Sequence, residues 1–402
     1  MERAVLGQEG LMFGIARSQD IKNLIYHLRY QVYIHEMGKN IFIADHKKQN
    51  LKDDLDDEGY LFYIRKAKQI AATVRLNFYN SSQSKAYFHK TYGLDHFLDF
   101  PLESITFSSR LIVHPDWRNT RILLHLFKYF YEEIKDRNIK FNFCTCAPYL
   151  VGLYQHLGYR RYKDNVIDPD VGYRIPMVML ANDKKYLKSV RSIFSRLIPD
   201  EQNDPLIGKW FQARFPNYIG YINERLIPKE DFFNYLSVRI HNDSSPIFRD
   251  LSSEDTQEFL SKSTVLNCKK GDVIINQGEL ANDMFLILKG SVDVSVNSNS
   301  KTYHLTVLGK GELFGEMAFL GKMRRSATVK ACEDLELLIL THTFLKKLMN
   351  VNPEITLTVM INISAMLSTR LKNTTQSWLK SNEEDIIIEP VENRDFLELG
   401  GI

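Results

Sequence analysis

The chain has 402 residues, 44% of them hydrophobic and 25% charged, and a formal net charge of +3 at pH 7. Its length predicts two domains or a little more, and its weak net charge gives no reason to expect nucleic acid as a partner. No apolar run reaches the ~18 residues of a membrane span, the N-terminus lacks a signal peptide, and the four cysteines fit no metal-ligand spacing, so we expect a cytoplasmic protein with reduced thiols and no metal site.

The first 182 residues alternate helix-like and strand-like segments. This alternation predicts an α+β domain with a mixed sheet and flanking helices. The predicted elements are a helix (24–34), a hairpin of two strands (61–79), a strand ended by proline (109–115), a helix (122–138), a buried strand (141–146) and a helix ended by glycine (151–159).

The rest of the chain changes character twice. Four prolines between aromatic-rich helical pieces predict a helical connector over 183–245. From Thr264, short β-rich runs punctuated by glycine predict a β-roll, which forms a second domain over 246–376 together with the helices that flank it. Residues 377–402 read as an acidic tail.

One stretch of the second domain, 314–329, places a carboxylate and a guanidinium around an otherwise apolar turn. Gly315 allows close approach of the backbone, Arg325 offers two parallel N–H groups to a phosphate, and Glu316 offers an acceptor to a sugar hydroxyl. Together these groups suit a cyclic nucleotide, and a surface ion pair on a β-turn is the simpler alternative.

This stretch resembles the phosphate-binding cassette of cyclic nucleotide-binding domains, as in protein kinase A regulatory subunits and catabolite activator protein. The family pattern F-G-E-[LI]-[AG]-L, a variable turn and R-[AST]-A corresponds to 314–319 and 325–327, with Met317 and Phe319 at two of its apolar positions. The resemblance implies that Glu316 accepts a hydrogen bond from the ribose 2′-OH and that Arg325 binds the phosphate. It also implies that the same pocket is lined by Phe314, Gly315, Met317, Ala318, Ser326 and Ala327.

The base of the nucleotide is less constrained by the motif. Ser326 fits either the guanine of cyclic GMP or the phosphate of cyclic AMP, and we expect cyclic AMP first and cyclic GMP second. Too little chain follows the C-terminal helix for a helix-turn-helix, which argues against a transcription factor. A homodimer through the C-terminal helices is one expected assembly.

Segments 109–127 and 151–159 resemble the Gcn5-related acyltransferase fold. In that family a splayed strand, here Leu111 to His114, pairs with the pantetheine of the donor, and R-x-x-G-x-G/A meets the pyrophosphate of coenzyme A. This chain has both glycines replaced in the run 118–123. Glycine lets the backbone reach a pyrophosphate, so its loss favours acyl carrier protein over acyl-CoA as the donor.

Acyl carrier protein is acidic, and basic residues gather around the helix at 122–138. They form either a docking face or an ordinary solvated helix face. These residues are Arg118, Arg121, Lys128, Lys135, Arg137 and Lys140.

A second set of residues resembles that of acyl-homoserine-lactone synthases and N-acyl amino acid synthases, which move an acyl chain from acyl carrier protein to an amine. The matching positions are Arg29, Tyr33, Asp54, Asp57, Arg75 and Arg110. Lactone synthases have a tryptophan after the first helix and a glutamate three residues before the last arginine. This chain has no tryptophan at the first place, and Phe107 stands in place of the glutamate. An amino acid or another small amine is therefore the expected acceptor.

The resemblance also implies how acyl transfer proceeds. Tyr154 would donate a proton to the leaving thiolate, and backbone N–H groups between Leu111 and Val113 would stabilise the oxyanion. The acceptor ammonium would be bound or deprotonated by a carboxylate, and an arginine would pair with an acceptor carboxylate. The candidates are Asp54, Asp57 and Glu103 for the first role, Arg75 and Arg110 for the second, and Arg118 for the donor phosphate.

Each of these residues also has a structural interpretation. Tyr154 would look the same as a packed core tyrosine, and DDLDDEG (53–59) would look the same as a solvated loop. A set of apolar residues forms either an acyl tunnel or ordinary core, namely Leu98, Phe100, Phe107, Leu124, Phe127 and Phe143.

Taken together, the sequence predicts a cyclic-nucleotide-regulated N-acyltransferase. Two alternatives remain open: a nucleotide-gated protein lysine acetyltransferase that uses acetyl-CoA, and a sensor without catalytic activity.

Overall fold

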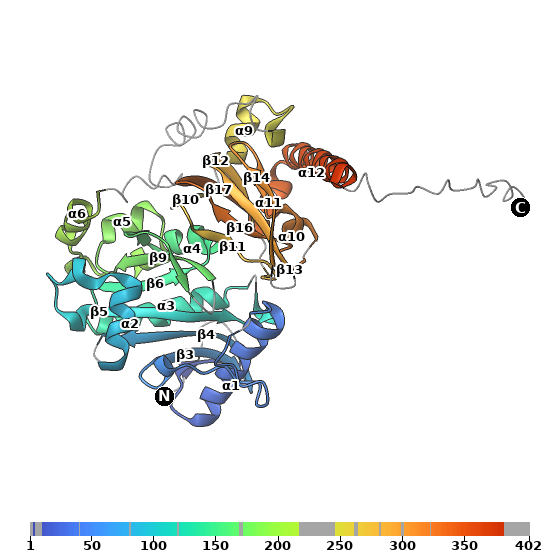
Figure 1. The fold of residues 1–402 in the computed structure, drawn as a ribbon. Coiled ribbons are helices and arrows are strands. Elements are labelled where there is room, and N and C mark those ends of the chain that lie inside the picture. Colours follow the sequence, from blue (N-terminus) through green and yellow to red (C-terminus); the bar gives the residue numbers. More distant parts are fainter. Residues whose placement is uncertain are drawn as a thin grey trace, which may run out of the picture.

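The computed structural model describes residues 3–4, 10–39, 41–79, 82–118, 120–168, 172–216, 246–260, 264–280, 283–298, 301–321 and 323–381. These residues form an N-terminal α+β domain and a C-terminal β-roll with flanking helices, which lie against each other (Figure 1). The predicted fold class is confirmed. The last part of the expected connector and most of the expected tail lie outside the described residues.

The N-terminal domain is built on a mixed sheet with the strand order β1-β2-β3-β4-β5-β6-β9-β7, and β8 pairs with β9. Strands β5 and β6 run parallel, and the pairs on either side of them are antiparallel. The strands are β1 (Arg3–Ala4), β2 (Leu11–Ile15), β3 (Tyr60–Lys66), β4 (Gln69–Phe78), β5 (Ile105–Val113), β6 (Phe141–Cys146), β7 (Tyr159–Arg161), β8 (Val166–Asp168) and β9 (Gly172–Leu180).

Helices cover both faces of this sheet. Successive side chains of a strand point to opposite faces, so each face has apolar residues that a helix can bury. Phe62 and Ile64 of β3 pack with helices α3 and α4, whereas Leu61 and Tyr63 pack with α1. The helices are α1 (Gln19–Tyr30), which continues as the π-helix η1 (Gln31–Glu36), α2 (Ser82–Tyr92), α3 (Ile122–Asp136), α4 (Val151–Leu157), α5 (Lys184–Ser189) and α6 (Pro205–Arg214).

The first part of the expected connector packs onto the N-terminal sheet. Leu187 of α5 belongs to the cluster that contains α3 and α4, and Ile207 and Phe211 of α6 belong to the aromatic cluster on the other face. Both helices are therefore held by the N-terminal core. None of the described helices combines the length and the hydropathy that a transmembrane span requires.

The C-terminal domain consists of two four-stranded antiparallel sheets, β10-β17-β12-β15 and β11-β16-β13-β14, with helices packed at one side. The strands are β10 (Thr264–Cys268), β11 (Val273–Ile275), β12 (Asp283–Lys289), β13 (Val292–Ser298), β14 (Lys301–Leu308), β15 (Leu313–Phe314), β16 (Thr328–Ala331) and β17 (Leu335–Thr341). The helices are α9 (Ser253–Leu260), α10 (Glu316–Gly321), α11 (His342–Val351) and α12 (Pro353–Ser381).

The two domains share an interface made of polar contacts and apolar packing. One cluster of buried apolar side chains continues from the N-terminal sheet into the β-roll. The Tyr173 hydroxyl donates to Asp272 at 2.7 Å, and Asn165 donates through Nδ2 to the carbonyl of Asn267 at 2.8 Å. The β-roll is thus anchored to strand β9 and the segment before β8.

Candidate functional site

Strand β5 separates from β6 at a bulge. The two strands pair in parallel only from Ile105 to Ser108. On the other side of β5, the pairing with β4 shifts so that Arg110 and Leu111 together face a single residue of β4, and Arg110 has φ of +54°. Such a bulge bends the strand and leaves the extra residue outside the ladder. Beyond Ser108 the edge of β5 is therefore no longer paired with β6.

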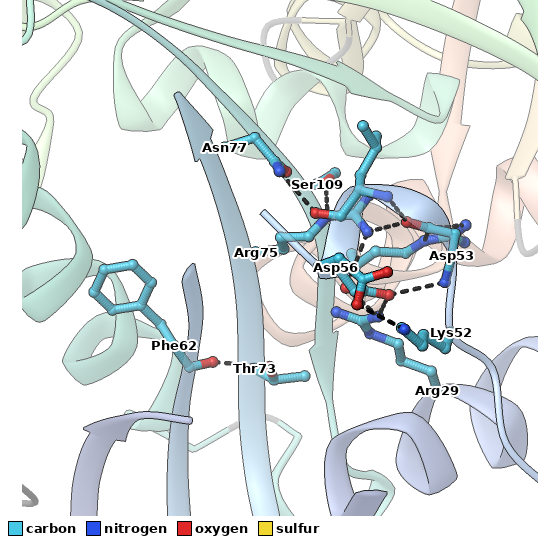
Figure 2. A network of polar contacts seen from close by, with 12 residues as sticks. Arg29, Lys52, Asp53, Asp56, Phe62, Thr73, Arg75, Asn77 and Ser109 are labelled. Atoms are coloured by element: carbon cyan, nitrogen blue, oxygen red, sulfur yellow. Dashed lines mark hydrogen bonds and ion pairs between the residues drawn. The ribbon is translucent and has the colours of Figure 1, made fainter. Parts of the chain in front are cut away.

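Three arginines converge beside this bulge on two carboxylates, and Figure 2 shows two of them, Arg29 and Arg75, with both acids, Asp53 and Asp56. Arg29 donates through Nη1 to both carboxylate oxygens of Asp56, at 2.8 and 2.7 Å, and both side chains are completely buried. Arg75 bridges the two acids, because it lies 3.0 Å from Asp56 and also pairs with Asp53. Its Nε donates to the Ser109 hydroxyl at 3.0 Å.

Asp53 ties the network to the bulge. It accepts from Arg110 at 3.0 Å through Nε and at 2.7 Å through Nη2. The Arg110 guanidinium lies 5.3 Å from the centre of the Tyr33 ring, so η1 and the bulge also touch. Arg110 is thus held in its left-handed conformation by an ion pair and an aromatic ring.

The network holds the Asp53 carboxylate ionised. Burial acts to raise the pKa of Asp53, but Arg75 and Arg110 outweigh it and hold that pKa well below its usual range. Burial lowers the pKa of Arg29, against the opposing effect of Asp56. Three guanidinium groups share two carboxylates, and Arg29 has two buried nitrogens, Nε and Nη2, without a hydrogen-bond partner. The site therefore carries excess positive charge.

The acids named from the sequence lie elsewhere. Asp53 and Asp56 face inward in place of the expected Asp54 and Asp57, which are exposed on the same 3₁₀ turn, where Asp57 pairs with Lys52 at the surface. Glu103 is exposed before the start of β5, so the stretch from Ile105 to Arg110, about 16 Å of strand, separates it from the bulge. The structure gives these three acids no contact with the network.

Gly59 makes room for the network. A Cβ at this position would lie 2.8 Å from Cδ of Arg75 and 2.8 Å from the carbonyl oxygen of Leu55. The glycine that ends DDLDDEG therefore allows the Arg75 side chain to pass. Sequence reasoning missed this role, and it also missed Asp53, Asp56 and Ser109.

Tyr154 is buried in the N-terminal core, with its ring centre 5.3 Å from that of Tyr159. Burial raises the pKa of the Tyr154 hydroxyl well above its ordinary value, reinforced by the nearby thiols of Cys144 and Cys146. The hydroxyl is therefore protonated at neutral pH. A protonated hydroxyl can donate a proton, although the raised pKa makes this group a weaker acid than a free phenol, so the shift by itself does not favour the role.

The donor-side residues lie along the free edge of β5. Arg118 pairs with Glu36 of η1, through Nη2 at 2.7 Å, and its Nε donates to the carbonyl of Val113 at 3.2 Å. Leu111 is half-buried and packs against the main core. Arg118 thus marks the far end of the edge that begins at the bulge.

The expected acyl tunnel is not assembled. Phe107 and Phe143 belong to the aromatic cluster on one face of the sheet, whereas Phe127 belongs to the core on the other face. Leu98 and Leu124 are 57% and 47% exposed, so they line no common cavity with the phenylalanines.

The C-terminal motif forms a second site. Arg325 is buried, donates through Nη1 to the carbonyl of Gly315 at 2.8 Å, and pairs through Nη2 with the buried carboxylate of Asp283 at 2.5 Å. Gly315 has φ of +84°, and a Cβ there would lie 2.6 Å from Nη1 of Arg325. Burial raises the pKa of Asp283 and lowers that of Arg325, and in each case the partner opposes the shift. Asp283 therefore stands beside the guanidinium that the motif assigns to a phosphate.

Glu316 is buried at the start of α10 and is also engaged. It accepts from Nη1 of Arg370 at 2.8 Å, and Arg370 also donates to the carbonyl of Leu313. Arg370 lies on α12, so the helix that follows the β-roll is fastened to the motif. Sequence reasoning missed both Asp283 and Arg370.

The remaining motif residues surround this pair of contacts. Phe314 is buried and stacks on Phe285 with ring centres 5.0 Å apart, and Ala318 is buried. Met317 and Ser326 are exposed and contact each other, with 3.6 Å between Sδ and Oγ. Ala327 is half-buried beside them.

Comparison with known proteins gives each half of the chain a counterpart. Residues 24–183 match the family model of the N-acyl amino acid synthase FeeM, and residues 265–352 match that of the cyclic nucleotide-binding domain. The matches fall on the two segments that carry the arginine network and the Arg325 motif.

Individual relatives share only part of their length with this chain. The cAMP-activated global transcriptional regulator CRP of Pasteurella multocida is 32% identical over 29% of this chain and 56% of its own. The cyclic AMP receptor protein of Thermus thermophilus is 34% identical over 32% and 58%, respectively. The crystal structure of Thermus thermophilus catabolite activator protein aligns with 34% identity and a TM-score of 0.32, over 35% of this chain and 65% of that one.

Proposed function

We propose that this chain, which joins an N-acyl amino acid synthase domain to a cyclic nucleotide-binding domain, is a nucleotide-regulated N-acyltransferase. It moves an acyl group from a phosphopantetheine thioester, carried by acyl carrier protein, to a small amine such as an amino acid. The observation that carries this proposal is the bulge at Arg110, which opens the β5 edge beside a three-arginine network.

The donor would lie along the β5 edge that is free of β6. Pantetheine carries amides, which pair with exposed backbone groups as a further strand would. The thioester carbonyl would then reach the N–H groups near Leu111, where an oxyanion can be stabilised. The residues after the edge, from Arg118 to Leu123, lack the glycines that a pyrophosphate needs, which favours acyl carrier protein as the carrier.

The reaction needs an unprotonated amine and a proton for the leaving thiolate. As the amine nitrogen forms its bond to the thioester carbon, the C–S bond breaks and the thiolate takes a proton. The hydroxyl of Tyr154 supplies that proton, and the resulting tyrosinate takes back the proton that the nitrogen loses as the amide forms, so the tyrosine is neutral again when the product leaves. Asp53 is too weak a base to deprotonate an amine because its pKa is held low, so its role is to orient Arg75 and Arg110.

The charge of the site supports an anionic acceptor. Excess positive charge at a buried site favours an anionic group on the ligand. The carboxylate of an amino acid meets that need, and Arg110, at the open side of the network with 13% of its side chain exposed, would receive it.

The C-terminal domain supplies control. Arg325 would bind the cyclic phosphate and Glu316 the ribose hydroxyl, with Phe314, Gly315, Met317, Ala318, Ser326 and Ala327 around them. Cyclic AMP is the first candidate and cyclic GMP the second.

The test is acyl transfer by the purified full chain. Acyl carrier protein loaded with a long-chain acyl group is incubated with the protein and a mixture of free amino acids, with and without cyclic AMP or cyclic GMP. The products are identified by mass spectrometry. We expect an N-acyl amino acid whose rate of formation depends on nucleotide and is lost in Arg110→Ala but not in Arg17→Ala, a change of an exposed arginine. Absence of product from both acyl carrier protein and acyl-CoA would overturn the proposal.

A further inference from the structure

On the side that faces the N-terminal domain, the mouth of the pocket around Arg325 is covered by that domain, whereas Met317 and Ser326 of the motif stay exposed. A small cavity there is lined by Arg325, Asp283 and Glu279 of the β-roll, and by Lys39 and Arg174 of the N-terminal domain. Its volume is about 40 Å³. Small-molecule sites usually measure about 300–1,000 Å³, so this side of the Arg325 site, which Glu316 does not line, has no room for a nucleotide in the arrangement observed.

Close contacts hold the end of η1 over this mouth. Arg324, next to the phosphate-binding arginine of the motif, donates through Nη1 to the carbonyls of Gly278 at 3.0 Å and Gly38 at 3.4 Å. Gly38 has φ of +63°, and a Cβ there would lie 1.7 Å from that same nitrogen. Only glycine lets the Arg324 guanidinium lie so close to this backbone.

Two further contacts fix the same edge. Lys39 pairs with Glu279 at 2.8 Å, and only 7% of the Lys39 side chain is exposed. Gly172, at the start of β9, approaches Glu279 so closely that a Cβ would lie 2.8 Å from Oε1. Glu279 is therefore contacted by the N-terminal domain at two places, Lys39 and Gly172.

We propose that the cyclic nucleotide and the N-terminal domain compete for the mouth of this pocket, so that nucleotide binding withdraws residues 37–39 from the β-roll. This inference rests on the proposed nucleotide site and adds how its occupancy reaches the acyl-transfer site. A ligand that binds only the undocked arrangement shifts the population toward it by its difference in affinity.

The withdrawn segment leads directly to the arginine network. The backbone N–H of Lys39 donates to the carbonyl of Tyr33 at 2.8 Å, and the Tyr33 ring lies over the Arg110 guanidinium. Arg118, at the far end of the β5 edge, pairs with Glu36 of the same π-helix. A movement of residues 37–39 therefore acts on both ends of that edge through η1.

Competition makes a reciprocal prediction about affinity. Weakening the contact between the domains lowers the free energy needed to separate them, so the apparent affinity for the cyclic nucleotide rises. Asn165 is a suitable position because it bonds to the Asn267 carbonyl and does not line the cavity. Lys163 is its matched control, since its ammonium donates to the carbonyl of Thr91 within the N-terminal domain.

The experiment is calorimetric titration of the full chain with cyclic AMP and with cyclic GMP, for the wild type, Asn165→Ala and Lys163→Ala. We expect Asn165→Ala to bind about fivefold more tightly than the wild type and Lys163→Ala to bind as the wild type does. Lys39→Ala and its control Lys52→Ala, which breaks a surface pair inside the N-terminal domain, repeat the comparison at a second contact.

Amide hydrogen exchange is measured on the wild type alone, so its result does not depend on how any variant folds. Saturating nucleotide should increase exchange in residues 37–39 relative to β3 and β4. If the nucleotide binds but the variants keep the wild-type affinity and exchange in residues 37–39 does not increase, the proposed competition is refuted and the proposed function stands. If neither nucleotide binds the wild type, the nucleotide site itself is refuted, and the competition with it.

Discussion

Replacing Asp53 by Asn removes the charge that joins the bulge to the arginine network. Asn has the same shape but is neutral, so Arg110 loses its paired carboxylate, to which it donates at 3.0 and 2.7 Å. Arg75 keeps Asp56 and Ser109, each at 3.0 Å. One guanidinium of the network is therefore left without an ionic partner.

The expected cost follows from the burial of this pair. Breaking a buried ion pair by removing one partner costs about 3–5 kcal/mol. Asp53 retains 15% exposure of its side chain, so the lower value, about 3 kcal/mol, is the better expectation. For a domain of this size each kcal/mol shifts Tm by about 2–4 °C, which gives a decrease of roughly 6–12 °C.

Differential scanning calorimetry of the full chain measures this decrease, and Asp54→Asn is its matched control. Asp54 is the exposed neighbour on the same turn, and surface substitutions change stability by about 0.5 kcal/mol or less. Equal effects of Asp53→Asn and Asp54→Asn on Tm would refute the assignment of Asp53, and not Asp54, to the network.

Other expectations concern the same sites. The pKa of Asp53 is lower in the folded protein than its value of about 3.9 in the unfolded chain, so its stabilisation is complete above that value and is lost as pH falls below it. The difference in stability between the wild type and Asp53→Asn, measured by urea titration, should therefore persist from pH 5 to 8 and shrink below about pH 4. Gly59→Ala should displace Arg75 and lower Tm by several degrees while also reducing acyl transfer, and an unchanged Tm would contradict the close approach at this glycine. Tyr154→Phe should lower kcat about 10²-fold or more with little change in KM, and an unchanged kcat would exclude Tyr154 as the proton donor. Asp283→Asn should strengthen cyclic AMP binding by removing a buried carboxylate beside Arg325, the residue that we propose binds the phosphate, and weaker binding in calorimetry would count against Asp283 as a competitor of the phosphate.

The sequence predicts elements well where a local pattern decides them. The hairpin of β3 and β4, the strand β5 and the β-roll are confirmed because alternating apolar residues, proline and glycine report directly on backbone geometry. The motif from Phe314 to Ala327 is also local, so its glycine and arginine could be found without the fold.

The acidic cluster shows where such reasoning fails. Four aspartates in DDLDDEG all satisfy the same charge pattern, and only the turn decides which pair faces inward. Spacing alone gives no usable signal, because Asp53 and Asp56 are three residues apart and so are Asp54 and Asp57; the reciprocal capping by Asp53 and Asp56 appears only in the folded turn.

Partners that are distant in the chain could not be predicted. Asp283 lies on β12 and reaches Arg325 across 42 residues, and Arg370 reaches Glu316 across 54. Nothing in the local sequence of either residue signals its partner, because the contact depends on how β12 and α12 pack against the motif.

The central claim is that a cyclic nucleotide bound at Arg325 controls acyl transfer at the bulge of β5. Its most direct test is the rate of N-acyl amino acid formation from acyl carrier protein, with and without saturating cyclic AMP or cyclic GMP, in the wild type and in Arg325→Ala. The account predicts a change of about fivefold or more with at least one nucleotide in the wild type and none in Arg325→Ala. Equal rates with and without either nucleotide in the wild type, or the same response in Arg325→Ala, would contradict it.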